Sequence, residues 1–579
     1  MVRVAWAAVG LALLVGAAAA VWIYCSPSPF ERSKWVQVTG FPDAVTQPVL
    51  SSDGRMLAFI RGPSTFVGEG EIYVKMLPSG EPVQLTHDGL PKMSPKFSPD
   101  GSRIAYTALG PRSTWDTWVV PVLGGKPQLW LPNASGLVWF DDHQLIFSRM
   151  LEADHMGLVT CLDSRTECRD LYVPANGGMA HRSYPSPDRK WVLAVEMDDR
   201  GIWMPCRLLP FDGTSVGRSV GPPGAPCTSA AWSPDGKWMY LSVNTGRNFH
   251  IWRQRFPAGK LEQLTSGPDG EEGIALAPDG RSLITAVGLR QRAVWYHDAL
   301  GDHQVSLEGY SLEPRLYIAG RKVCYLRSES MSTRLSQVWI EDLDSGENVL
   351  LLPGLDVLKY DLSADGRIAV AALNAGGKPR LWIAWVDRRS PSRQIPSVTG
   401  DAPVFSPSGD IFFSTAEGDV KFLFRVRPDG TGLQKVSSQP IIEVHGVSPD
   451  GKWVAGLGST PSEPGWFEFA YPTGGGTPVP LCNPPCEVRW GPDGKWMYIS
   501  VYKAWISRLA AGRTYILPTR SNSAFPEMPV GGFRSETQLA AFPGVRIIQA
   551  ADVAPGPTPE SYVFSRETTQ RNLFRIPLH

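Results

Sequence analysis

The sequence lacks an excess of charge of either sign, because 56 lysine and arginine residues balance 56 aspartate and glutamate residues. Charged residues make up only 19% of the chain, below the roughly 25% of an average soluble protein. Binding to nucleic acid or to a strongly acidic surface requires a basic excess, so the composition excludes both classes of protein. Hydrophobic residues reach 43%, which is enough for large cores and excludes global disorder.

Long apolar faces with helical periodicity are also missing after residue 25. The chain instead has 58 glycines, 52 prolines and 10% aromatic residues. Glycine and proline favour turns, and aromatic side chains are enriched in strands. These properties predict an all-β fold for the part of the chain after the amino terminus.

One uncharged apolar run stands at the amino terminus, from Val4 to Tyr24, and it is long enough to span a bilayer as a helix. We expect residues 1–25 to be a membrane anchor, followed by a short Ser-Pro-rich tether at residues 26–33. The alternatives are a signal peptide cleaved near Ala20 and a lipoprotein attached through Cys25. All of them place the bulk of the chain outside the cytoplasm, in the periplasm, or make it secreted.

A turn of the type Ser-Pro-Asp-Gly recurs along the chain, each time followed by about five apolar or alternating residues. Proline presets the second turn position, aspartate suits the third, and glycine supplies a backbone conformation that other residues resist. From residue 233 onward, the recognisable copies are spaced by 44, 86, 43, 42 and 43 residues. Four short strands in such a period are the unit of a β-propeller blade. The twelve copies, three of them degraded, lie at residues 51–54, 98–101, 139–142, 186–189, 233–236, 277–280, 316–321, 363–366, 406–409, 448–451, 491–494 and 553–556.

The turn and strand at residues 98–106, together with Gln-Leu-Thr strands at residues 84–86 and 263–265, resemble the TolB-type, WD-repeat-like β-propeller repeat. This resemblance covers nearly the whole chain from about residue 34. It implies a propeller fold and binding between proteins of the cell envelope. Related repeats also form the non-catalytic propellers of prolyl-oligopeptidase-like peptidases, so the motif is specific for the fold and unspecific for function.

Duplication of half the chain is indicated by residues 234–242, which recur almost letter for letter at residues 492–500. The offset of 258 residues is six repeats of 43. We therefore predict tandem six-bladed propellers at residues 34–300 and 301–579, because one ring of twelve blades exceeds the usual number. A seven-plus-five or irregular split and a single ring are the alternatives.

The chain ends suggest how the rings close. Residues 35–39 form an expected outer strand that completes the sixth blade, while residues 572–578 form a third strand with no fourth after it. Residues 303–307 are expected to supply that missing strand to the second ring. Extra length between Gly512 and Val545 predicts an irregular loop.

Candidate ligand-binding residues are His181, Glu443 and His445, which precede Ser-Pro-Asp turns on strands expected to line a central channel. The chain contains no paired-histidine metal motif and no calcium loop, so we expect no metal and no cofactor. Gly213–Gly217 matches the Gly-x-Ser-x-Gly nucleophile motif around Ser215, but a turn between strands lacks the following helix that the motif needs. The acidic residues of Gly270–Gly273 are expected to lie in a solvated loop.

Cysteine is scarce, with eight residues, and the exported location permits disulfides. Three pairs are close in sequence, and we predict a bond between the first pair, whose members flank a short turn. The candidate pairs are Cys161 with Cys168, Cys482 with Cys486, and Cys206 with Cys227.

The function that these observations favour is a non-catalytic interaction module, membrane-anchored outside the cytoplasm, which binds a protein or another envelope ligand through its loops. One alternative is a propeller enzyme, a lyase or hydrolase, with polar groups from several blades converging in a channel. The other is the sensor domain of a membrane regulator. Its cytoplasmic output would come from a partner protein, because only three residues precede the apolar run.

Overall fold

The computed structural model describes residues 32–579 apart from a set of short gaps and the last residue. The gaps are residues 111–113, 152–154, 200, 308, 330–334, 375–376, 419, 461–462, 484 and 503–511. The predicted amino-terminal anchor and tether therefore lie outside the described residues, except for the end of the tether. Within the described part, no helix is long and apolar enough to cross a membrane.

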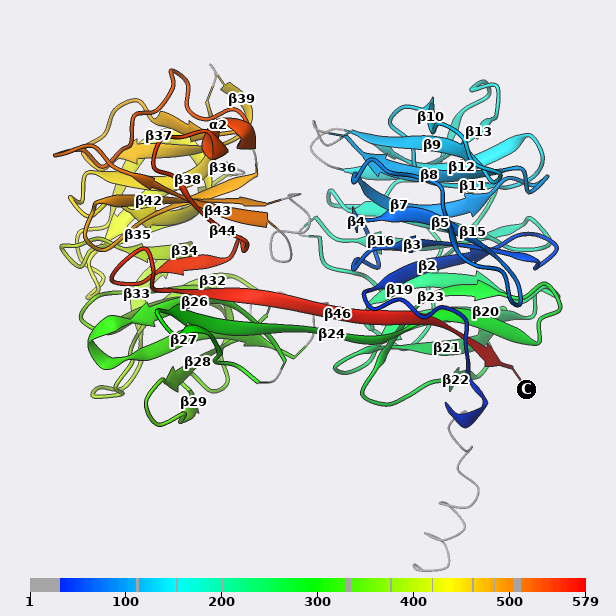
Figure 1. Ribbon diagram of the computed structural model, residues 1–579, viewed down its shortest axis with the longest axis horizontal. Helices are drawn as coiled ribbons and strands as arrows, with labels where there is room; N and C mark the ends of the chain where they lie inside the picture. Colours follow the sequence, from blue (N-terminus) through cyan, green and yellow to red (C-terminus); the bar gives the residue numbers. More distant parts are fainter. Residues whose placement is uncertain are drawn as a thin grey trace, which may run out of the picture.

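Antiparallel strands form almost all of the regular structure, which confirms the all-β prediction (Figure 1). Figure 1 shows two lobes joined by two long strands. The only described α-helix is short, α2 (Glu536–Ala540), and it lies in the region between Gly512 and Val545 where an irregular loop is predicted. Two 3-10 turns, Arg32–Lys34 and Ile318–Gly320, complete the described helical elements.

The first lobe is a succession of antiparallel meanders, each entered through its first strand. Its strands in chain order are β2 (Val45–Leu50), β3 (Met56–Arg61), β4 (Gly68–Glu69), β5 (Glu71–Met76), β6 (Val83–Gln84), β7 (Pro91–Phe97), β8 (Arg103–Leu109), β9 (Trp115–Pro121), β10 (Gln128–Leu131), β11 (Ser135–Trp139), β12 (Gln144–Met150), β13 (Met156–Leu162), β14 (Arg169–Tyr172), β15 (Met179–Pro185), β16 (Trp191–Met197), β17 (Arg207–Pro210), β18 (Arg218–Ser219), β19 (Cys227–Trp232), β20 (Trp238–Asn244), β21 (Phe249–Arg255), β22 (Leu261–Gln263) and β23 (Gly270–Leu276). The first strands β2, β7, β11, β15, β19 and β23 contact one another in this order, and β23 returns to β2.

The second lobe repeats this arrangement. Its strands are β26 (Tyr310–Tyr317), β27 (Lys322–Ser328), β28 (Gln337–Asp342), β29 (Asn348–Leu350), β30 (Asp356–Leu362), β31 (Arg367–Leu373), β32 (Pro379–Trp385), β33 (Arg393–Thr399), β34 (Asp401–Phe405), β35 (Ile411–Glu417), β36 (Val420–Val426), β37 (Gln434–Val447), β38 (Trp453–Thr460), β39 (Glu463–Pro472), β40 (Val479–Cys482), β41 (Cys486–Trp490), β42 (Trp496–Tyr502), β43 (Gly512–Pro518), β44 (Arg546–Ile548) and β45 (Val553–Pro555). Contacts here run from β26 through β30, β34, β37, β41 and β45 back to β26.

The recurring turn has the local structure that its sequence predicts. In the copy at residues 98–101, the Ser98 hydroxyl donates to Asp100 Oδ1 at 2.5 Å, and Ser102 N donates to the same oxygen at 3.1 Å. Gly101 has a φ of +69°, in the left-handed region that glycine adopts without strain. These hydrogen bonds lower the pKa of Asp100 to about 2, with Ser98 as the largest cause. The aspartate therefore serves the turn, because its Oδ1 accepts both hydrogen bonds that close it.

Two long strands connect the lobes: β24 (Ser282–Asp298) and β46 (Tyr562–Pro577). They pair antiparallel along their whole length, from Ser282 opposite Pro577 to His297 opposite Tyr562. We call this pair the interlobe ribbon. In the first lobe, β23 and β1 (Val36–Gln37) flank the ribbon, while β45 and β25 (Gly301–Gln304) flank it in the second lobe.

This pairing refines the expected closure of both lobes. Residues 35–39 do provide an outer strand to the first lobe, but its partner is the end of β46, with Val36 opposite Arg575. The predicted strand at residues 303–307 begins earlier, as β25, and pairs with β24. In the first lobe, the end of β46 therefore lies between β1 and β24, and β25 lies beside β24 instead of beside β46. The reason is that β24 and β46 each run through both lobes, so one half of each strand belongs to each lobe.

Charged side chains fix the middle of the ribbon. Arg290 Nε and Arg292 donate to the two oxygens of Glu567 at 2.6 Å each. The Glu567 side chain is only 5% exposed. Burial alone would raise the pKa of Glu567, but the two arginines outweigh burial and lower it to about 2. One carboxylate therefore holds two like charges together where the ribbon passes between the lobes.

Replacing Glu567 with glutamine is expected to destabilise the protein by about 3–5 kcal/mol, because Arg290 and Arg292 would be left buried without a counter-charge. The Glu567 contribution is present above its unfolded pKa near 4.3 and is lost as the pH falls toward 2. Urea unfolding at pH 7 and pH 3 measures both effects. Glu560→Gln, which removes an exposed partner of Arg546, is the matched control and should change little. Equal effects of the two substitutions would contradict this role.

The ribbon also predicts how an isolated first lobe behaves. A fragment of residues 34–300 leaves the β24 edge and β1 without β46, so we expect it to self-associate through the open edge. A second fragment joins residues 34–289 to residues 570–579 through an Asn-Gly turn. It restores the end of β46 beside β24 as a hairpin, since Leu289 and Gln570 are opposite each other. The hairpin version should be monomeric by size-exclusion chromatography and should melt at a higher temperature. A monomeric 34–300 fragment of equal stability would show that the ribbon is not needed for closure.

Candidate functional site

The centre of the second lobe contains a cluster of charged side chains from several first strands. Glu313 comes from β26, Lys359 from β30, Glu443 and His445 from β37, and Glu487 from β41. Glu468 from β39 adds a further carboxylate behind them. We call these six residues the His445 cluster. The structure thus brings together two sequence-predicted residues, Glu443 and His445, with four that sequence reasoning missed.

Backbone irregularities direct these side chains toward one another. The register shifts between Val357 and Lys359 on β30, and between Ile441 and Glu443 on β37. Such bulges re-aim side chains at the rim or centre of a closed sheet. A second shift, between Val444 and Gly446, interrupts the alternation of side chains at His445, and the ring nitrogen Nε2 of His445 lies 3.9 Å from Glu443.

His445 is the middle of the cluster, with only 3% of the residue exposed. Its Nδ1 lies 2.9 Å from both carboxylate oxygens of Glu468. Its Nε2 lies 3.9 Å from Glu443 and 3.8 Å from Glu487, and it has no hydrogen-bond partner among the described residues. The imidazole ring therefore lies between three carboxylates.

The protonation of His445 follows from these neighbours. Burial alone would lower the pKa of His445, but Glu468 and Glu487 outweigh burial and raise it to about 10. His445 is therefore an imidazolium cation at neutral pH. Burial also raises the pKa of Glu468, whereas His445, Lys359 and Arg489 together lower the pKa of Glu487.

Lys359 supplies the second cation of the cluster. Its Nζ forms ion pairs with Glu313 and, at 2.7 Å, with Glu443. Arg489 lies 3.8 Å from Glu487 and provides a third positive charge. The four carboxylates of the cluster thus face three cations, Lys359, Arg489 and His445. The side chains of Lys359, Arg489 and Glu487 are 28%, 18% and 14% exposed, so the cluster is partly reachable from solvent on this side.

The centre of the first lobe has different chemistry. His181 packs against the rings of Phe66, Trp115 and Trp203 at centroid distances of 4.6, 5.9 and 6.1 Å. Burial, and secondarily Arg182, lower the pKa of His181 to about 3, so this ring is neutral. Neither of its ring nitrogens has a hydrogen-bond partner among the described residues. His181 is thus surrounded by aromatic rings, while the other predicted histidine is surrounded by carboxylates.

Arg182 holds the first-lobe centre together through neutral acceptors. Its guanidinium donates to Ser94 Oγ, Gln47 Oε1 and the carbonyl oxygens of Thr228 and Thr65, at 2.7–3.2 Å. These acceptors come from distant parts of the chain, which the guanidinium ties across the centre. No group of three or more metal-ligating side chains with suitable geometry exists among the described residues of either lobe.

Two weaker sequence candidates are also located. Ser215 lies in an exposed turn between β17 and β18, and its hydroxyl accepts from Gly217 N at 3.2 Å. The acidic residues Glu271 and Glu272 were expected in a solvated loop, and that expectation is wrong because they are buried on β23. Glu271 accepts from His250 at 2.7 Å, and Glu272 pairs with Arg571 of β46 at 2.8 Å. Buried partners from distant strands, which the local sequence does not reveal, make this burial possible.

The structure contains three disulfides, and they join the three pairs of cysteines that the sequence singled out. Their Cα–Cα distances are 4.1 Å for Cys161–Cys168, 5.3 Å for Cys206–Cys227 and 6.5 Å for Cys482–Cys486. Cys324 is free and buried, and burial raises the pKa of its thiol to about 12. Cys25 lies outside the described residues.

Replacing His445 with glutamine is expected to destabilise the protein by about 3–5 kcal/mol at pH 6, because Glu443, Glu468 and Glu487 would lose their central cation. The folded pKa is raised, so the His445 contribution is complete below its unfolded pKa near 6.5 and is lost as the pH rises through about 10. The stability difference between the two proteins should therefore shrink between pH 6 and pH 10 in urea unfolding. His303→Gln at an exposed position is the control. A difference that grows with pH would show that His445 is neutral in the folded protein.

Comparison with known proteins gives a local sequence match to TolB. The Tol-Pal system protein TolB of Anaeromyxobacter dehalogenans strain 2CP-C is 34% identical over 109 residues, which are 18% of this chain and 24% of that protein. The protein of the same name from Anaeromyxobacter sp. strain K is 32% identical over 108 residues. The chain thus spans about a quarter of the length of the curated relatives it matches. No family model matches the chain.

Solved structures superpose weakly. TolB from Acinetobacter baumannii shares 13% identity, covering 67% of this chain and 64% of that one, with a TM-score of 0.22. The tricorn protease shares 12% identity, covering 89% and 54%, with a TM-score of 0.33. The local sequence match therefore supports the predicted resemblance to the TolB-type β-propeller repeat over the stretch that the chain shares with the TolB relatives.

Proposed function

We propose that this chain is a non-catalytic interaction module that binds a protein or envelope ligand outside the cytoplasm. The observation that carries the proposal is the convergence of four carboxylates and three cations in the His445 cluster, which is partly exposed on the side of Lys359, Arg489 and Glu487. A cationic group of a partner would add a further positive charge opposite these carboxylates. Local similarity to proteins named for the Tol-Pal system supports an envelope partner.

The scaffold of this module is two six-bladed propeller rings, at residues 34–300 and 301–579, which exchange strands through the interlobe ribbon. The two closed cycles of first-strand contacts support this arrangement. So does the repetition of four-stranded meanders in each lobe. Propellers present loops on a rigid scaffold, which suits binding of a folded partner.

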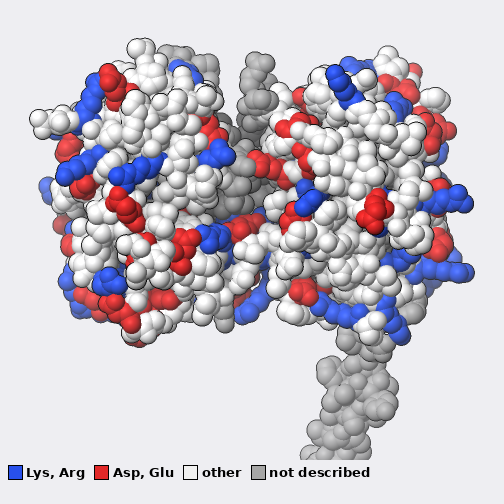
Figure 2. Space-filling view, in the orientation of Figure 1, with Lys and Arg blue, Asp and Glu red and all other residues white. Residues whose placement is uncertain are grey.

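Export from the cytoplasm is supported by the three disulfides, since such bonds persist in oxidising compartments. We propose that residues 1–25 anchor the chain in the membrane as a single helix, with the lobes on the periplasmic side. Basic and acidic side chains are interspersed over the visible face of both lobes (Figure 2). This mixture is unlike the single-sign surface of a nucleic-acid binder.

The enzyme alternative has one observation in its favour, which is the convergence of a histidine and several carboxylates from different strands. A general base near neutral pH must be unprotonated to accept a proton. The raised pKa of His445 keeps it charged at neutral pH, so His445 does not meet this requirement for a general base.

Affinity capture from a cell-envelope extract tests the proposal with the full chain and two variants. We expect the wild-type chain to retain a specific protein, and Glu443→Gln to reduce its recovery about tenfold, because one carboxylate of the cluster is lost. Glu417→Gln, which removes an exposed carboxylate on β35, should leave recovery unchanged. Thermal unfolding of each variant confirms that the fold is intact. Identical recovery from all three proteins would overturn the His445 cluster as the contact site.

A further inference from the structure

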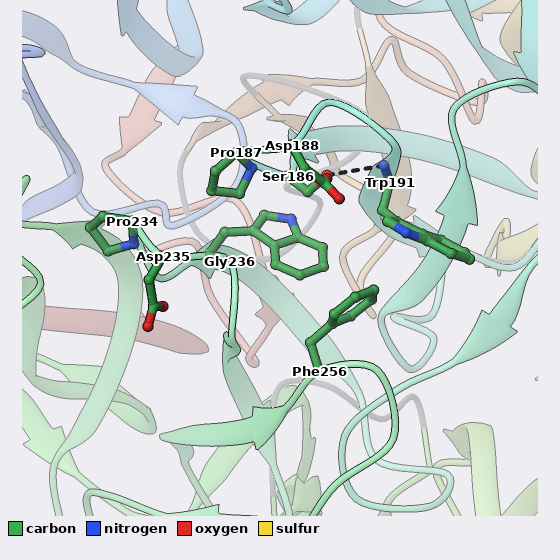
Figure 3. Close-up of a pocket in the computed structure, with 9 residues that line it drawn as sticks. Ser186, Pro187, Asp188, Trp191, Pro234, Asp235, Gly236 and Phe256 are labelled. Atoms are coloured by element: carbon green, nitrogen blue, oxygen red, sulfur yellow. Dashed lines mark hydrogen bonds between the residues drawn. The ribbon is translucent and has the colours of Figure 1, made fainter.

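A groove of about 340 Å³ opens between two neighbouring meanders of the first lobe, where the turns after β15 and β19 lie side by side (Figure 3). We call it the turn groove and define it by Pro187, Asp188, Trp191, Trp232, Asp235 and Phe256. Its volume is at the lower end of the range for ligand pockets. It lies in the opposite lobe from the His445 cluster.

Aromatic rings form the walls of the turn groove. Phe256 packs edge-to-face against Trp191 and Trp232 at centroid distances of 5.7 and 5.2 Å. The Trp232 indole N–H donates to the carbonyl oxygen of Tyr184 at 3.0 Å, so its polar group is already satisfied. The groove therefore offers aromatic surface and no indole donor from Trp232.

Two carboxylates stand at the rim of the groove. Asp188 Oδ1 accepts from the Ser186 hydroxyl at 2.5 Å, and Asp235 Oδ1 accepts from the Ser233 hydroxyl at 2.6 Å. These hydrogen bonds are the largest cause of the lowered pKa of each aspartate, so both remain ionised. Lys237, which is exposed, lies 3.4 Å from Asp235, and the charge of Lys190 contributes to the lowered pKa of Asp188.

Other copies of the repeat carry a tryptophan at the position of Trp191, and the groups that lie over their rings can be compared. Trp238, Trp453 and Trp496 occupy the same position after their turns as Trp191 does. A guanidinium lies over two of them, from Arg253 at 4.5 Å over Trp238 and from Arg546 at 5.0 Å over Trp496, whereas Trp453 packs edge-to-face against Phe525 at 5.1 Å. Each of these arginines also pairs with a nearby glutamate. Trp191 has no such cation over its ring within the described part of the chain, although acidic groups lie beside it.

We propose that the turn groove binds an arginine side chain of a protein partner. The planar guanidinium stacks on an aromatic face and donates to carboxylates at the same time, which is the combination seen at Trp238 and Trp496. Asp188, whose Oδ1 accepts the turn hydrogen bonds, supplies the carboxylate, and Trp191 supplies the ring. This proposal rests on the proposed interaction function in one respect, which is that the partner is taken to be a protein.

The test is titration of the full chain with a fluorescently labelled, end-blocked Gly-Arg-Gly peptide, followed by anisotropy. The matched probe is the same peptide with citrulline, which keeps the shape of arginine but lacks its charge. We expect the arginine peptide to bind at least about tenfold more tightly, and its affinity to fall between about 20 mM and about 200 mM salt. Equal binding of the two peptides, or binding by neither, would overturn the proposal.

Substitutions locate the site. Asp188→Asn keeps an oxygen for the turn but removes the charge, and Trp191→Phe keeps a ring of smaller area. Each substitution is expected to weaken binding of the arginine peptide by at least about fivefold. Asp493→Asn is the matched control, because it changes the equivalent turn where Arg546 already covers Trp496. Unchanged affinity in Asp188→Asn and Trp191→Phe would overturn the assignment, as would an equal loss in Asp493→Asn. Because this assay uses a defined peptide, its failure would leave the envelope-capture result unaffected.

Discussion

Pairing of β24 with β46 is the constraint on which both lobes depend. A strand at the edge of a sheet exposes unpaired backbone groups, and closing a ring removes that exposure. In this chain neither lobe is built from its own half alone, since the end of β46 pairs with β1 and β24 in the first lobe, and the end of β24 pairs with β25 and β46 in the second lobe. Glu567 stabilises the crossing point because it is shared by Arg290 and Arg292.

The centres of the two lobes show how one repeat produces two chemistries. Every first strand of the first lobe, and most of those in the second, carries a register shift that turns side chains toward the centre. In the first lobe, Arg182 fills this space and donates to neutral oxygens. In the second lobe, carboxylates fill it and raise the pKa of His445. Buried charge requires compensation, so each centre is a network of paired groups.

In this scaffold the same side chains serve stability and recognition. The His445 cluster is a buried network of ion pairs, and the turn groove is built from residues of the recurring turns. The turn groove illustrates this double use. Its aspartates are required by the turns, and the same carboxylates, placed beside Trp191, give the groove affinity for a cation.

The sequence by itself determined the all-β class and the position of each recurring turn, predicted the Cys161–Cys168 bond and named the other two cysteine pairs as candidates, because these depend on local backbone preferences and on short separations along the chain. It also pointed to His445 and Glu443 through their distance from a turn. Only the tertiary structure decided that Glu468, Glu487, Lys359 and Glu313 surround His445, that His181 lies among aromatic rings, and that Glu271 and Glu272 are buried. It also decided that the last strand pairs with the first. These contacts join residues tens to hundreds of positions apart, and the pKa values and charge balance that govern function arise only when folding brings those residues together.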